Sequence, residues 1–206
     1  MSEKLSEREE QDILNAIVEF IQAAVHSVLY YRSIYPRESF ERCRLYGIVV
    51  FRNRHPDVVR YVEESVQHIL GPLREKRLVE FQIPVLYLHN DERIVEQRVR
   101  ERFRIMFLDP RGGDGGDMTR DDWYRVFDDC KATLMRLQAL SSSDMMPEAV
   151  VGQSSFRLNL IVRGREGMEE LMCVDGVSTE DGSITLPLRT VQLPMCSMVC
   201  MIDITS

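Results

Sequence analysis

A long apolar segment between residues 6 and 35 constrains the fold more than any other part of the chain. Ser6 and Glu9 have the spacing of a helix-capping box at its start. Apolar residues then recur every three or four positions, as on the buried face of a helix: Leu14, Ile17, Val18, Ile21, Ala24, Val25 and Val28. Further apolar residues widen this arc, so the helix is predicted to lie between two layers of structure. The residue before a proline disfavours helical geometry, so the helix is expected to end near Ile34 or Tyr35, before Pro36.

A second helix and a β-hairpin are predicted to follow. Pro56 fits the first position of a helix, and valines at one-face spacing continue the pattern to the interruption at Gly71-Pro72. Two alternating runs, 78–88 and 94–107, flank an Asn-Asp turn and predict a hairpin. Pro84 lies inside the first run and lacks a backbone donor, so it is expected at a sheet edge, a bulge or a strand end.

The C-terminal half adds a third helix and a strand-rich tail. Apolar residues at helical spacing from Trp123 to Leu137 predict a helix that starts near Thr119 and ends at the serines 141–143. The predicted strands of the tail cover residues 156–162, 171–174, 184–188 and 198–204. Three helices followed by strands predict an α+β fold, with the helices packed on one face of a mainly antiparallel sheet. A chain of 206 residues suits a single domain.

The charge and the motif content disfavour several classes of function. A net charge of −7 argues against strong direct DNA binding, which needs clustered cationic side chains. Arg98, Arg100, Arg102 and Arg104 are expected to share one strand face, and a solvated sheet face is the preferred interpretation over a nucleic-acid track. The chain carries no recognised catalytic motif, and its histidines lack metal-ligand spacing. We therefore predict that it is not an enzyme, holds no metal or cofactor, and has protein partners.

The cysteine and hydropathy patterns indicate an intracellular protein. The five cysteines include no C-x-x-C pair, so free thiols are expected instead of a disulfide framework. The first residues are too charged for a secretory signal, and no apolar run approaches the ~20 residues that a membrane helix needs. We expect no membrane partner and a location in the cytosol or nucleus.

The region of the first two helices resembles the HORMA-domain family. The resemblance rests on residues in this order: Glu19-Phe20, Ala24-Val25-His26, Leu29-Tyr30, Ile34-Tyr35-Pro36, Phe40, Tyr46, Val50, His55-Pro56 and Tyr61-Val62. Within the family, His55-Pro56 followed by Tyr61-Val62 is most similar to the branch that serves translesion DNA polymerase zeta. The segment 186–190 is similar to the family's turn into its last strands. The resemblance implies a HORMA-type core, residues 1–163, and a C-terminal safety belt, residues 164–206.

The resemblance also implies a peptide clamp, in which a partner strand adds to a sheet edge and the belt wraps over it. The implied ligand is a peptide of the polymerase zeta catalytic subunit, and the implied contacts are Tyr61, Phe156, Leu158, Leu160 and Val162. A C-terminal domain of a Y-family polymerase scaffold is expected to dock on Thr185, Leu186, Val199 and Met201. A HORMA homodimer or heterodimer is expected to involve Lys131, Ala132 and Arg136. The belt departs from the family in lacking a tryptophan, because the chain's only one is Trp123.

Two functions remain open on this resemblance. The first is an adaptor of the nucleus, or of the nucleus and cytoplasm, that links polymerase zeta to a Y-family scaffold in translesion DNA synthesis and the DNA damage response. The second is a HORMA signalling protein of the spindle checkpoint or the meiotic chromosome axis. The two functions predict different peptide-bearing partners.

Overall fold

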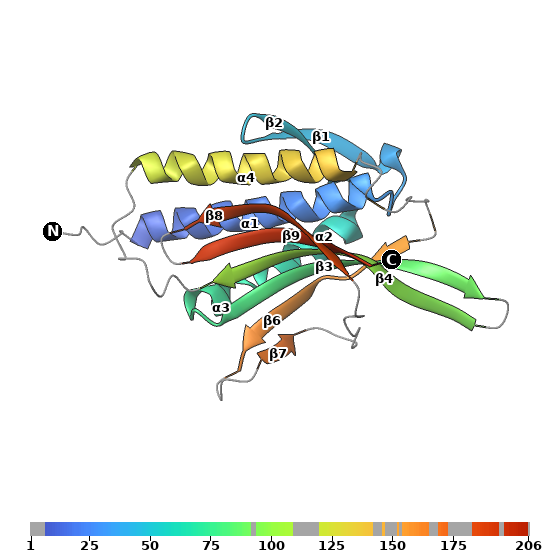
Figure 1. The fold of residues 1–206 in the computed structure, drawn as a ribbon. Coiled ribbons are helices and arrows are strands. Elements are labelled where there is room, and N and C mark those ends of the chain that lie inside the picture. The colour runs from blue at the N-terminus through green and yellow to red at the C-terminus, as the bar shows by residue number, and fades with distance from the viewer. Residues whose placement is uncertain are drawn as a thin grey trace.

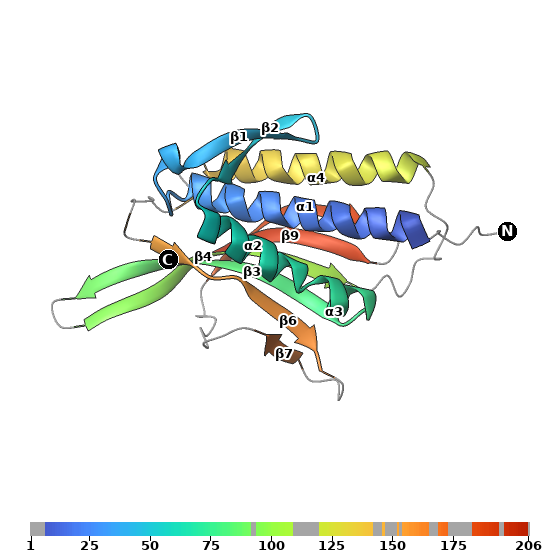
Figure 2. The ribbon, with the colours of Figure 1, turned by 180° about the vertical axis from the view of Figure 1, so that it is seen from behind.

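The computed structural model describes residues 7–91, 94–108, 120–141, 146, 152, 154–164, 169–172, 183–193 and 196–205. Helices lie over one face of a twisted sheet (Figures 1 and 2). The three long helices are α1 (Glu7–Tyr31), α2 (Pro56–Gln67) and α4 (Arg120–Ser141), and a short α3 (Leu70–Arg74) follows α2. The predicted α+β arrangement of three helices on an antiparallel sheet is confirmed.

The sheet is antiparallel at every described pair of strands. Its order is β7-β6-β3-β4-β9-β8, and β5 also pairs with β3. The strand bounds are β3 Leu78–Asp91, β4 Ile94–Leu108, β5 Ser154–Phe156, β6 Asn159–Arg163, β7 Glu169–Met172, β8 Ile184–Gln192 and β9 Ser197–Ile204. The predicted hairpin is β3–β4, and β8 and β9 form a second hairpin, here called the C-terminal hairpin, on the far side of β4.

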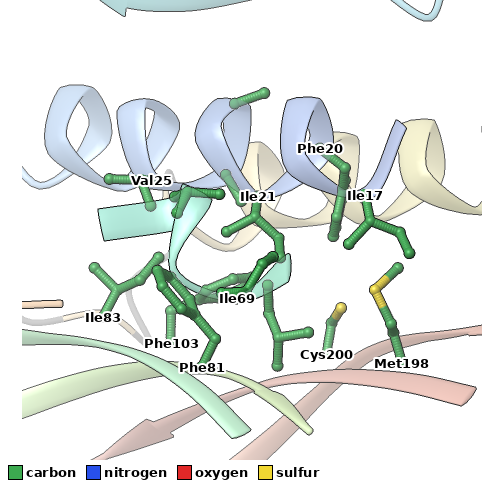
Figure 3. Close-up of a cluster of buried hydrophobic side chains, with 14 of the residues drawn as sticks. Ile17, Phe20, Ile21, Val25, Ile69, Phe81, Ile83, Phe103, Met198 and Cys200 are labelled. Carbon is green, nitrogen blue, oxygen red and sulfur yellow. The ribbon is translucent and has the colours of Figure 1, made fainter. Parts of the chain in front are cut away.

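The helix α1 is the central element of the core. Figure 3 shows Ile17, Ile21 and Val25 of α1 facing Phe81 of β3 and Met198 of β9, all of them buried. The part of α1 from residue 11 onward is long and apolar enough to cross a membrane, so the expectation that no such run exists was wrong. Most of that stretch is buried inside the fold, where α1 contacts α2, α4 and β2. Its apolar character therefore comes from contact with other layers of the protein on several sides.

A local cap ends α1 before the position predicted from Pro36. The helix ends at Tyr31, whereas the end was expected near Ile34 or Tyr35. Ser33 has a φ of 49°, its N–H donates to the carbonyl of Tyr30 at 3.2 Å, and the Ile34 N–H donates to the carbonyl of Leu29 at 3.0 Å. This pair of bonds is a Schellman motif, which terminates a helix without help from proline.

The hairpin of β1 (Phe40–Leu45) and β2 (Ile48–Asn53) was not predicted. Its two-residue turn places Tyr46 at φ 49° and Gly47 at φ 75°, the left-handed geometry that short hairpins favour. It packs against α1 through Tyr30 and Phe51, whose rings stack at 3.6 Å with 8° between their planes. Figure 1 shows the hairpin on the helical side of the molecule, away from the sheet.

Pro84 explains why β5 and β6 are separate strands. β3 is an interior strand, so the sheet-edge alternative for Pro84 was wrong. The Pro84 carbonyl accepts from the N–H of Arg157 at 3.2 Å, and the N and C=O of a strand residue point to the same neighbour. The missing donor of Pro84 therefore faces the interruption between Phe156 and Asn159. A register shift against β4, between Val85 and Leu86, lies directly beside it.

Candidate functional site

A groove of about 520 Å³ opens beside the first turn of α2. It is formed by the segment after α1, the end of β2, the start of α2 and the end of β5. The residues that line it are Tyr35, Pro36, Ser39, Asn53, His55, Asp57, Val58, Tyr61 and Phe156. The groove therefore joins segments that are far apart in the sequence.

One side of the groove is aromatic. Phe156 lies between two tyrosines, with ring centroids 5.7 Å from Tyr61 and 6.3 Å from Tyr35. Both contacts are edge-to-face, the arrangement that aromatic rings prefer. The side chain of Tyr61 is 43% exposed, so much of its ring is free for a ligand. Burial, and then the nearby Tyr61, raise the pKa of the Tyr35 hydroxyl.

The other side is polar and held by hydrogen bonds around Asn53. The buried Asn53 amide donates to Ser39 Oγ at 3.0 Å, and its Oδ1 accepts from the His55 N–H at 2.8 Å. His55 Nδ1 in turn accepts from the Asp57 N–H at 3.3 Å and caps α2. These contacts hold the start of α2 against the end of β2.

His26 of α1 lies beneath this polar side. It is buried, and its Nδ1 accepts from the backbone N–H of Asn53 at 3.5 Å. Burial and the charge of Arg52 lower the pKa of His26 to about 4. The imidazole is therefore neutral near pH 7 and serves as an acceptor within the core.

The groove is suited to binding an apolar side chain. Its aromatic rings can contact such a side chain of a ligand, while the bonds of Asn53 fix the surrounding backbone. Within the described ranges, no group of three or more His, Cys, Asp or Glu side chains could hold a metal ion. Cys43, Cys130 and Cys200 are free thiols, as predicted, Cys196 is buried, and Cys173 lies outside the described residues.

The structure separates the predicted peptide contacts into two groups. Tyr61 and Phe156 line the groove, whereas Leu158, Leu160 and Val162 are buried with their side chains in the core. Those three side chains point to the helical face of the sheet, so an added strand could contact them only through its own side chains on that same face.

A strand of this chain already pairs with that edge of β6. The register of β7 pairs Leu160 with Met172 and Arg163 with Glu169. The predicted edge is therefore covered between residues 160 and 163, and among the described strands none pairs with the part that adjoins the groove at β5.

The predicted scaffold-docking residues lie on the C-terminal hairpin but not on one face. Thr185, Val199 and Met201 lie on the outer face, defined here as the face of the sheet opposite the helices. Leu186 is paired with the buried Ile202 and so lies on the helical side. A single flat partner surface would reach the first three residues directly and Leu186 only at the sheet edge.

The predicted dimerisation residues lie on α4, where Arg136 is exposed and Lys131 and Ala132 are half-buried. Tyr124 and Met135 are 68% and 50% exposed, and spacings of seven and four residues place both on the face of Lys131. These two apolar side chains were missed by the prediction, although their helical spacing was readable in the sequence.

The four arginines of β4 do not share one face, so that prediction was wrong. Arg100 lies 5.9 Å from the ring of Tyr87, whose hydroxyl donates at 2.7 Å to Glu101 on the helical side. Arg104 instead donates to Glu80 on the outer face. The register shift in β3–β4 puts Arg100 and Glu101 on the same side and reverses the alternation.

Sequence reasoning missed most of the groove. The end of α1 was predicted from Tyr35-Pro36 and the start of α2 from Pro56 in His55-Pro56. No role was predicted for Ser39 or Asn53. Their convergence depends on the unpredicted β1–β2 hairpin, which brings Asn53 beside α2.

Comparisons with known proteins agree on one family. A family model described as the HORMA domain matches residues 14–117, just over half of the chain. The mitotic spindle assembly checkpoint protein MAD2B of Homo sapiens is 34% identical over 91 residues, 44% of this chain and 42% of that protein. The DNA polymerase zeta processivity subunit of Arabidopsis thaliana is 33% identical over 86 residues, 42% of this chain and 39% of that protein. The match spans about two fifths of the length of these relatives.

Solved structures extend the likeness of the fold to almost the whole chain. A chain in the crystal structure of the mitotic checkpoint complex has a TM-score of 0.71 and 18% identity, covering 95% of this chain and 99% of that chain. Caenorhabditis elegans HTP-2 bound to an HTP-3 closure motif has a TM-score of 0.68 and 12% identity, covering 95% of this chain and 87% of that chain.

Proposed function

The chain belongs to the HORMA-domain family, and from this premise we propose that it is a non-catalytic adaptor that clamps a linear peptide of a partner protein. The proposed ligand is a segment of the DNA polymerase zeta catalytic subunit. The proposed setting is translesion DNA synthesis in the nucleus.

The position of Phe156 is the observation that carries this proposal. Phe156 is a strand residue of β5, paired with Val85, and it is also the central ring of the aromatic side of the groove. An extended peptide beside β5 would thus pass the mouth of the groove and could place an apolar side chain against Tyr61.

Binding along the rest of the edge requires β7 to move. Backbone bonds of β7 to Leu160–Arg163 use the groups that an added strand would need. We propose that the partner strand replaces β7 there and that residues 164–206 act as the belt that retains it.

The choice of partner is supported by the curated relatives. Two of them are named as processivity subunits of DNA polymerase zeta, in Arabidopsis thaliana and Schizosaccharomyces pombe. We propose that Thr185, Val199 and Met201, with Leu186 at the sheet edge, receive the C-terminal domain of a Y-family polymerase scaffold.

A second candidate is a HORMA signalling protein of the spindle checkpoint or meiotic axis. It is favoured by the fold shared with a chain of the mitotic checkpoint complex and with HTP-2 bound to a closure motif. Both candidates use the same groove and edge and differ in the peptide that is captured.

We predict that Tyr61→Ala folds normally and binds the polymerase peptide about 2 kcal/mol more weakly, roughly thirtyfold, because a half-exposed interface aromatic contributes on this scale. Calorimetry with a synthetic segment of the catalytic subunit measures the loss. Tyr124→Ala is the matched control, since Tyr124 is exposed on α4 and is not among the residues of the groove.

Equal affinity of Tyr61→Ala and wild type would remove the groove from the peptide site. Tight binding of a checkpoint or axis peptide, with no binding of the polymerase segment, would establish the second candidate instead.

A further inference from the structure

A row of polar side chains crosses the outer face of the sheet. It begins at Asn159 of β6, whose amide donates to Gln82 of β3 at 3.5 Å, and Gln82 donates to Glu80 at 2.9 Å. Arg104 of β4 donates through Nε and Nη2 to the two carboxylate oxygens of Glu80, at 2.5 and 2.9 Å. The row thus joins β6 to the middle of the sheet.

Asp203 carries the row into the C-terminal hairpin. Arg104 Nη1 donates to Asp203 Oδ2 at 3.1 Å, and Thr185 Oγ1 donates to Asp203 Oδ1 at 2.7 Å. Pairing of β4 with β9 places Met201 opposite Arg104, so Asp203 is a diagonal neighbour of Arg104. The contact therefore forms only when β9 is paired with β4 in this register.

The acidic groups of the row are largely removed from water. Glu80 is 4% exposed and Asp203 is 8% exposed, and buried carboxylates are costly unless they are paired. Arg104 is hydrogen-bonded to both, and its bond to Glu80, followed by the influence of Asp203, holds the pKa of its guanidinium above the ordinary value. Arg104 thus forms ion pairs with two buried carboxylates, those of Glu80 and Asp203.

The hairpin has a second ion pair of different character. Arg189 of β8 reaches Asp129 of α4 at 2.6 Å, with side chains 49% and 20% exposed. Solvent screens such a pair, so it contributes little to holding two elements together. The pair of Arg104 and Asp203 is less exposed and fixed by three further bonds.

We propose that Arg104 is a positioning residue that latches the C-terminal hairpin onto β4 through Asp203. Breaking this contact is the step that lets the hairpin open away from the sheet as a unit. A latch of this kind controls how long the hairpin stays closed, and, where the proposed peptide clamp holds, how long a captured peptide is retained.

The experiment compares two isosteric changes of equal charge. Asp203→Asn removes the latch, and the matched control Asp129→Asn removes the exposed pair of the same hairpin. Native-state hydrogen exchange of the full chain should show β8 and β9 amides exchanging roughly tenfold or more faster in Asp203→Asn, the scale of a lost bond to a charged group. Exchange of β3, and of β8 and β9 in the control, should stay within about twofold of wild type.

Arg104→Lys tests the same contact from the other partner. It keeps the positive charge but loses the forked set of bonds, so its hairpin should exchange faster than wild type. The latch proposal would be overturned if hairpin exchange were unchanged in Asp203→Asn, or if Asp129→Asn accelerated it equally. It would also be overturned if both latch variants accelerated exchange of β3 as much as exchange of the hairpin. Failure of wild type to bind the peptide would reject the clamp alone, because hairpin exchange is measured without peptide.

Discussion

His26 is the residue whose titration should be visible in the stability of the whole domain. Its pKa falls from 6.5 to about 4 on folding because burial, and then Arg52, disfavour the charged form. The folded state therefore binds this proton less well than the unfolded state. Stability contributed by neutral His26 is complete above its ordinary pKa and is lost as the pH falls from 6.5 towards 4.

We expect His26 to cost the protein about 2 kcal/mol of unfolding free energy between about pH 7.5 and pH 5. Denaturant titrations of wild type and His26→Gln at both pH values measure it, since the glutamine cannot take up the proton. His68→Gln, a change at an exposed histidine, should retain the wild-type dependence. Equal pH dependence in wild type and His26→Gln would contradict the prediction.

At the same scale, individual site residues were only partly readable from the sequence. Tyr61 was placed in the site by its position after His55-Pro56, and it does line the groove. Asn53 carried no such signal, because its role depends on bonds to Ser39 and His55 that only the folded β1–β2 hairpin creates. Leu160, which the resemblance implied as a strand contact, is buried on the helical face of β6, and its role in peptide binding stays a prediction.

At the scale of elements, long periodic segments were predictable and short connections were not. The helices α1, α2 and α4 and the β3–β4 hairpin follow clear patterns of apolar residues. The β1–β2 hairpin was missed because its strands are short, carry mixed burial, and turn with a tyrosine at positive φ. The end of α1 was misplaced because Ser33 caps it through backbone bonds that no side-chain pattern announces.

The strand β7 provides the prediction at this scale. A partner strand on β6 would compete for the same backbone groups, so peptide at saturating concentration should remove the hydrogen-exchange protection of amides 169–172. The C-terminal hairpin should remain protected, because it pairs with the opposite side of the sheet. Unaltered protection of these amides in a saturated complex would show that the peptide binds without displacing β7.

At the scale of the whole molecule, the surface of α4 is the predicted site of self-association. On α4 the exposed Tyr124 and Met135 flank the half-buried Lys131, and this combination of apolar area with a cation is suited to an isologous contact between two copies.

We predict that Lys131→Glu weakens self-association through α4 about tenfold and leaves peptide affinity unchanged, because the reversed charge would repel the acidic groups of the other copy that Lys131 attracts across the interface. Sedimentation over a concentration series measures the dimer constant. Arg74→Glu on α3 is a control of equal charge change at another exposed site. An identical dimer constant for Lys131→Glu and wild type would place the interface elsewhere.

The interruption opposite Pro84 has a consequence for what this molecule can recognise. Because β5 and β6 are separate strands, the edge beside the groove does not continue straight into the edge along residues 160–163. Under the proposed function, a ligand that uses both must be bipartite, with an anchor for the groove and a strand for β6, joined by a residue that tolerates a bend. Selection among ligands would then depend on the spacing between the two halves as much as on the side chains in either half.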